Sequence, residues 1–94
     1  MERIQLLNPE GKKGSNIVKE KYDLIKHVML ETIKENGEIS FKELANVINE
    51  KLHGKWEGSI TWYVTAVKLD LEARGLIERF PKKRQQNVRI SEGD

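Results

Sequence analysis

The sequence contains no cysteine, and its apolar runs extend over only a few residues at a time. The lack of cysteine excludes disulfides and thiolate metal sites. The lack of a long apolar run excludes a transmembrane helix and the core of a secretory signal. We therefore expect a protein of the cytoplasm.

Recognisable catalytic motifs are also missing. There is no glycine-rich phosphate loop and no His-Glu metal motif, and the serines stand at helix starts or in loops. His27 lies among apolar neighbours, where a lone histidine is far more often packed or exposed than a ligand. His53 precedes a glycine and has no second histidine or carboxylate at metal-binding spacing. We expect no enzyme activity, no metal and no cofactor.

Charged residues are frequent but nearly balanced. They make up 34% of the 94 residues, and the net charge is only +2. This length is typical of one domain with one modest core. A net charge this small does not by itself indicate a nucleic-acid-binding protein, so the positions of the charges must decide.

Three helices are predicted from apolar residues that recur at helical spacing, over residues 17–35, 41–53 and 59–74. The second begins with the capping box Ser40-x-x-Glu43, and the third begins with Ser59 as a candidate N-cap. Gly75 can adopt the positive φ that ends a helix. The short connection between the last two helices predicts a helix-turn-helix element.

A β-hairpin is predicted after the third helix. Two short apolar segments, Leu76–Phe80 and Val88–Ile90, flank Pro81 and a polar run that can turn. Ile39 is predicted to add a small third strand. The expected fold is α+β, with an N-terminal arm (1–15), a domain of three helices and a hairpin (16–91), and a disordered tail (92–94). Whether the arm packs on its own domain or on a second copy stays open.

The segment from Val67 to Arg79 reads V-K-L-D-L-E-A-R-G-L-I-E-R. It resembles the recognition-helix end and first wing strand of winged helix-turn-helix repressors of the multiple-antibiotic-resistance regulator type. Their common text is a helix ending in Leu-Glu-x-x-Gly-Leu-Ile/Val-x-Arg. The resemblance implies a winged helix that binds duplex DNA as a small transcriptional regulator. Asn8-Pro9 and the pairing of Trp62 with Leu69–Gly75 are also similar to a small uncharacterised bacterial family, which implies no activity.

The third helix is predicted to present a polar face beside its core stripe. At roughly 100° per residue, Thr61, Thr65, Lys68 and Glu72 gather on this face. In a winged helix such a face enters the major groove, where threonine and lysine can contact bases or phosphates. The candidate DNA-reading residues are Ser59, Thr61, Thr65 and Lys68. The alternative is a solvated face, because Asp70 and Glu72 would repel phosphates.

A second apolar stripe lies nearly opposite the core and consists of Trp62, Ala66, Leu69 and Ala73. A monomer of this size normally keeps such a face polar. Cover by the arm, cover by the hairpin or the Trp56 loop, and contact with a second protein chain are the three explanations. Packing within the chain is the first expectation and a homodimer the second. A hydrophobic ligand pocket has no separate support.

The predicted hairpin carries the clearest charge signal. From Arg79 to Arg89 there are five cations and no acid, together with neutral hydrogen-bonding side chains. A basic loop beside a helix-turn-helix can contact a phosphate backbone. The candidate residues are Arg79, Lys82, Lys83, Arg84, Gln85, Gln86 and Arg89. The alternatives are a solvated turn or an edge whose charges discourage strand pairing.

Two functions therefore remain open. The first is duplex DNA binding, with a homodimer placing two helices on half-sites about one helical turn apart. The second is a winged-helix protein-interaction module that uses Trp62, Ala66 and Leu69 without binding DNA. The sequence identifies neither a target site nor a small-molecule effector.

Overall fold

The computed structural model describes residues 2–11, 14–56, 58–82 and 85–91. Within these residues the fold is α+β, with three helices and two small antiparallel sheets. The helices are α1 (Lys19–Asn36), α2 (Phe41–Leu52) and α3 (Ile60–Ala73). The strands are β1 (Arg3–Gln5), β2 (Asn16–Val18), β3 (Glu38–Ser40), β4 (Ile77–Lys82) and β5 (Gln85–Ile90). The predicted tail, residues 92–94, lies outside the described residues.

Local hydrogen bonds fix the starts of α2 and α3 and the end of α3 where the sequence predicts them. The Ser40 hydroxyl accepts from the Glu43 N–H at 3.1 Å, and the Ser59 hydroxyl accepts from the Trp62 N–H at 3.2 Å. Gly75 has a φ of +77°. It donates to the Glu72 carbonyl at 3.1 Å, and the next N–H donates to the Leu71 carbonyl at 3.0 Å. This pair of bonds is a Schellman motif, which satisfies carbonyls at the end of α3.

The C-terminal sheet has the strand order β3-β5-β4. Ile39 and Arg79 both lie opposite Val88, so the third strand predicted at Ile39 is present. The last two strands are longer than predicted, because β4 continues through Pro81, which lies opposite Gln86. Proline is tolerated there because β4 is an edge strand, where an N–H is not required on the open side.

The predicted arm contains a strand that was not predicted from the sequence. Ile4 in β1 lies opposite Ile17 in β2, and the Lys19 N–H donates to the Glu2 carbonyl at 2.9 Å. The predicted helix over 17–35 therefore starts at Lys19, because Ile17 belongs to the strand that pairs with the arm. Leu6 is only 1% exposed and belongs to the core. The arm thus packs on its own domain, which was one of the two options.

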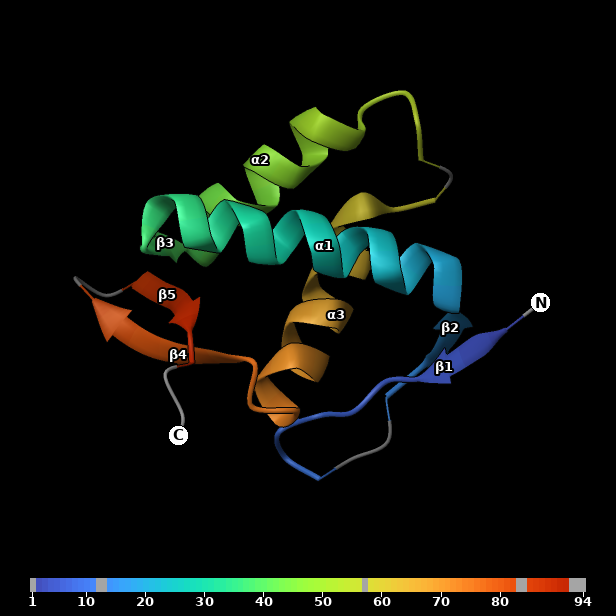
Figure 1. Cartoon of the computed structure of the whole chain (residues 1–94), viewed down its shortest axis with the longest axis horizontal. Helices are drawn as coiled ribbons and strands as arrows, with labels where there is room; N and C mark the ends of the chain where they lie inside the picture. Colours follow the sequence, from blue (N-terminus) through green and yellow to red (C-terminus); the bar gives the residue numbers. More distant parts are fainter. Residues whose placement is uncertain (1, 12–13, 57, 83–84, 92–94) are drawn as a thin grey trace.

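The core lies where the helices cross between the two sheets. Figure 1 shows the β3-β5-β4 sheet at one end of the molecule and the β1–β2 pair at the opposite end, with the helices between them. Each helix contributes fully buried side chains, among them Ile25, Met29, Ile33, Leu44, Ile48, Val64, Val67 and Leu71. These residues are among the apolar positions whose helical spacing predicts the three helices. Among the described residues, no helix combines the length and apolarity needed to cross a membrane.

Candidate functional site

Lys68 does not lie on an exposed face of α3. It is 3% exposed, its Nζ lies 2.9 Å from Glu72 Oε1, and it sits 4.9 Å from the centroid of the Phe41 ring. The prediction of an exposed face at Lys68 and Glu72 is therefore wrong. The physical reason is the contact with Phe41, the first residue of α2. The two charges neutralise each other beneath the surface.

Three of the other predicted residues on α3 are accessible. Ser59, Thr61 and Thr65 are exposed along the first half of the helix. The Ser59 hydroxyl already accepts a hydrogen bond from the helix backbone, so it also serves as the cap. The predicted DNA-reading residues that are exposed therefore present neutral hydroxyl groups.

Asp70 is a buried anchor for the arm. Its carboxylate is fully buried and accepts from the Leu7 N–H at 2.8 Å, the Tyr22 hydroxyl at 2.6 Å and Arg74 Nε at 2.8 Å. Arg74 also donates to the Gln5 carbonyl at 3.4 Å. Asp70 is expected from the sequence to repel phosphates from an exposed face, but its oxygens are directed at α1, the arm and Arg74. The signal in the sequence is the Asp70–Arg74 spacing, which places an acid and a base one helical turn apart.

The same contacts alter the ionisation of two neighbours. Burial, followed by the hydrogen bond to Asp70, raises the pKa of the Tyr22 hydroxyl far above its ordinary value. The hydrogen bond that Arg74 donates to Asp70 raises the pKa of the Arg74 guanidinium. The site therefore holds a neutral phenol and a permanently charged guanidinium around one carboxylate, an arrangement suited to fixing the arm in place.

The arm covers the apolar stripe of α3 only in part. Trp62 remains 45% exposed, whereas Ala66 and Leu69 are partly buried. A hollow of about 200 Å³ remains between the arm and the helix. Its nine lining residues are Leu6, Leu7, Asn8, Gly14, Ser15, Trp62, Thr65, Ala66 and Leu69. None of these nine described residues carries a charge, so the lining combines apolar groups with hydroxyl and amide groups.

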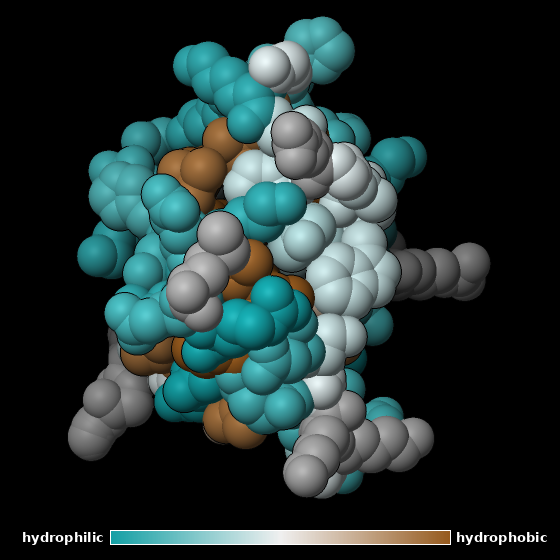
Figure 2. Space-filling model, turned by 90° about the vertical axis from the view of Figure 1, so that its right-hand side faces the viewer, coloured by the Kyte–Doolittle hydropathy of each residue, from teal (hydrophilic) through white to brown (hydrophobic). Residues whose placement is uncertain are grey.

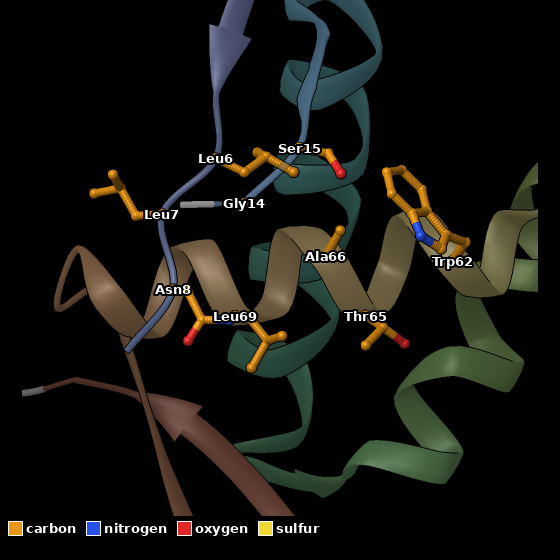
Figure 3. Close-up of a pocket in the computed structure, with 9 residues that line it drawn as sticks. All are labelled: Leu6, Leu7, Asn8, Gly14, Ser15, Trp62, Thr65, Ala66 and Leu69. Atoms are coloured by element: carbon orange, nitrogen blue, oxygen red, sulfur yellow. The ribbon is translucent and has the colours of Figure 1, made fainter. Parts of the chain in front are cut away.

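Figure 3 shows how the walls of the hollow are arranged. Leu6 and Ser15 approach from the arm side, Ala66 forms the floor, and the Trp62 ring stands on the other side. Leu7 points away from Leu6 and is 42% exposed. Seen from the end of the molecule that carries β1 and β2, small hydrophobic areas lie among hydrophilic side chains (Figure 2). The structure thus brings together the predicted interface residues Trp62, Ala66 and Leu69 with a wall that the arm supplies.

Aromatic packing supports Trp62 from one side. Its ring lies edge-on to Tyr63 with centroids 5.0 Å apart, and Tyr63 makes the same kind of contact with Trp56, also at 5.0 Å. Edge-to-face pairs of this kind are favourable beyond their buried area. Tyr63, the next residue in α3, therefore restrains the exposed Trp62 side chain. This restraint lowers the conformational entropy that Trp62 would lose on binding a partner.

The predicted basic hairpin is only partly open to a ligand. Arg79, Gln85 and Gln86 are exposed, but Arg89 pairs with Glu78 and lies 4.7 Å from the centroid of the Phe80 ring. Glu78 lies one residue before the segment from Arg79 to Arg89, which contains no acid. It lies opposite Arg89 across the strand pair. Lys83 and Arg84, together with the side chain of Lys82, lie outside the described residues.

A scan against protein-family models matches residues 3–87 to a family of unknown function. The chain belongs to that family, DUF6958. The resemblance to an uncharacterised family is thereby confirmed, and the match attaches no activity. Comparison with curated proteins found no match, and comparison with solved structures found none either.

The DUF6958 match includes the arm as well as the helices. It begins in β1 and ends in β5. Asp70, its partner Tyr22 and the hollow beneath the arm all lie within it. The docked arm is therefore a part of the DUF6958 domain and not an appendage to it.

Proposed function

We propose that this DUF6958 protein is a winged-helix protein-interaction module that docks a partner on the outer face of α3. We define this outer face as Trp62, Thr65, Ala66 and Leu69 together with the arm residues that border the hollow. The observation that carries the proposal is the combination of a 45% exposed Trp62 with a hollow of about 200 Å³ beside it, whose nine described lining residues carry no charge.

The order of the elements supports the winged-helix assignment. The chain runs α1, β3, α2, α3, β4 and β5, and its C-terminal sheet has the order β3-β5-β4. The second and third helices are joined by a short connection, and the third leads directly into the antiparallel strand pair. This is the order that the resemblance to winged helix-turn-helix proteins implies. Fold alone does not decide between DNA and protein as the partner.

The chemistry of the outer face favours a protein partner. Reading of base edges depends mainly on arginine, lysine, asparagine and glutamine. From α3 the outer face presents threonine, alanine, leucine and tryptophan, since Lys68 is buried against Phe41 and Glu72. From the arm it adds the Asn8 amide beside apolar and small residues. Cores of protein interfaces are depleted in charge and enriched in aromatic residues, and tryptophan is frequent among their strongest contacts.

Site-specific photo-crosslinking tests this function. A benzophenone amino acid replaces Thr65, which is exposed and lines the hollow, in the full chain expressed in its native cells. The control places the same group at Leu24, which is 43% exposed on α1 and does not line the hollow. We expect protein adducts from position 65 in excess over position 24. Equal adducts from both positions, or none, contradict a docking role for the outer face.

Duplex DNA binding is the second candidate, and the strand pair β4–β5 favours it. Arg79, Gln85 and Gln86 are exposed, and the sequence adds Lys82, Lys83 and Arg84 to the same segment. Such a segment suits contact with the phosphate backbone more than reading of bases. In this case the protein acts as a small transcriptional regulator or an architectural DNA-binding protein, and α3 contributes only the hydroxyls of Ser59, Thr61 and Thr65.

A salt series separates the two candidates. Binding to labelled random duplex DNA is followed by fluorescence anisotropy for the wild type and for the triple variant Lys82→Ala, Lys83→Ala, Arg84→Ala. If these residues contact phosphates, each lost contact reduces the slope of log K against log salt by about 0.9. The control removes three exposed lysines elsewhere, Lys34, Lys51 and Lys55. Equal slopes for the wild type and the β4–β5 variant exclude this role.

A further inference from the structure

We infer that the partner of the outer face is a second copy of this chain. The two copies are related by a twofold axis, so that Trp62 of each copy enters the hollow of the other. This inference rests on the proposed protein-interaction function and names its partner. It makes the outer face an isologous interface, in which the same patch serves both copies.

The first argument is that the patch is complementary to itself. A twofold interface requires a projection and a recess on the same surface, each within reach of the symmetry axis. Trp62 projects from α3, and the hollow begins at its side, between the indole and the arm residues Leu6 and Ser15 (Figure 3). A rotation of 180° about an axis between these features places each projection against the other copy's recess.

The second argument concerns charge. In a twofold dimer, a charge close to the axis faces the same charge of the other copy, which is unfavourable unless it is neutralised. Charged residues make up 34% of the chain, yet none of the nine described residues around the hollow is charged. Such a lining avoids repulsion between identical copies. It also provides no charge pattern by which a different protein would be selected.

The third argument concerns size. The hollow measures about 200 Å³, and an apolar cavity of about 150 Å³ can already hold a benzene ring. An aromatic side chain buries about 150–250 Å² when it is enclosed. The exposed Leu7, at 42%, borders the hollow and extends the contact. Burial of Trp62 and Leu7 from each copy corresponds to an interface at the small end of the range.

Sedimentation equilibrium tests the inference on the full chain. Wild type is measured from about 1 µM to about 1 mM, a range that brackets a small interface. Two variants alter the outer face: Trp62→Ala removes the projection, and Thr65→Glu places a like charge near the axis. We expect a wild-type monomer–dimer equilibrium that each variant weakens at least tenfold. Leu24→Ala is the matched control, with similar exposure on α1, and should dimerise like wild type.

A fluorescence measurement covers the case in which Trp62→Ala alters the fold. The chain has two tryptophans, so Trp56→Phe leaves Trp62 as the single emitter while keeping a ring beside Tyr63. We expect the emission of Trp62 to shift to shorter wavelength as the concentration rises, and its quenching by iodide to fall. Emission and quenching that stay constant while a dimer forms place the interface elsewhere and overturn the inference.

The results distinguish this inference from the function it rests on. A wild type that stays monomeric throughout the range overturns the second copy as partner. In that case, adducts from position 65 with a different protein still support the interaction function, and an absence of adducts refutes both. Adducts of twice the chain mass from position 65, together with loss of the dimer in Thr65→Glu, support both.

Discussion

The second half of α3 and the strand pair β4–β5 are both rich in charged residues, but they use their charges differently. In α3, Lys68 and Glu72 form an ion pair whose side chains are 4% and 7% exposed. Across β4–β5, Arg89 and Glu78 form a pair whose side chains are 48% and 44% exposed. A pair of one basic and one acidic side chain is therefore buried in α3 but half exposed across β4–β5.

This difference separates structural charges from those available to a partner. Buried charges must be paired, and removing one partner is expensive because the other stays out of water. Exposed pairs contribute little, since water and salt screen them. The helical part of the segment that resembles a repressor's recognition helix is thus engaged mainly in holding the arm and α2 through Asp70, Arg74 and Lys68. The charges that can reach a ligand follow later, in β4–β5.

The largest expected effect comes from breaking the arm anchor. Asp70→Ala leaves the buried Tyr22 hydroxyl and the partly buried Leu7 N–H without their acceptor, and it deprives Arg74 of its carboxylate. We expect a loss of about 3–5 kcal/mol in the free energy of unfolding, measured by urea denaturation with circular dichroism. Glu78→Ala, the exposed counterpart, should cost no more than about 1 kcal/mol. Equal losses in the two variants contradict the distinction between the regions.

A smaller effect is expected from the ion pair beside Phe41. Glu72→Ala leaves the Lys68 ammonium buried without its partner, so we expect a loss of about 2–3 kcal/mol in the free energy of unfolding. The double variant Lys68→Met, Glu72→Leu should recover most of this stability, since apolar residues of similar size can replace a buried pair. Urea denaturation of the single and double variants gives the coupling energy. Purely additive losses show that the pair is not coupled.

The raised pKa of the Tyr22 hydroxyl, which donates to Asp70 of α3, predicts that the stability of the protein depends on pH. Its pKa is raised in the folded protein, so above about pH 10 the unfolded chain loses this proton while the folded chain keeps it. The folded state then binds more protons, and stability falls as pH rises, with a slope that approaches about 1.4 kcal/mol per pH unit. Tyr22→Phe should remove this contribution. The prediction is refuted if the free energies of unfolding of wild type and Tyr22→Phe change in parallel between about pH 9 and pH 11.

The smallest expected change in stability is at the exposed pair. Glu78→Gln should alter the free energy of unfolding by less than about 1 kcal/mol, because the pair with Arg89 is half exposed. If β4–β5 contacts DNA, the released arginine adds one phosphate contact and steepens the salt slope by about 0.9. Fluorescence anisotropy checks this against Glu35→Gln, which removes an exposed acid from α1. A steeper slope in both variants shows a net-charge effect and not a local one.

The features that could be predicted from the sequence depend on neighbours along the chain. Ser40 and Ser59 cap helices through bonds that reach three residues, and Gly75 ends α3 through bonds that reach three to five residues. The apolar stripe of Trp62, Ala66 and Leu69 followed from helical spacing. These interactions are local, so the order of residues is sufficient to locate them.

The features that were missed depend on which distant segment covers a surface. Helical spacing gives the direction in which Lys68 points, but not that Phe41 lies over it. The strands β1 and β2 have three residues each, too few for an alternating pattern to stand out. Asp70 anchors the arm because it accepts a hydrogen bond from the N–H of Leu7, which lies 63 residues earlier in the chain. The hollow exists only once the arm is in place, so no local pattern could have predicted it.

That separation of 63 residues has a consequence for the synthesis of the protein. The arm is translated before its anchor, and at roughly 5–20 residues per second the delay between Leu7 and Asp70 is roughly 3–13 s. Throughout this interval the Leu6 side chain, which is almost completely buried in the folded protein, lacks its final environment. Docking of the arm is therefore a late event in the maturation of each newly made chain, and the outer face is completed only at that stage.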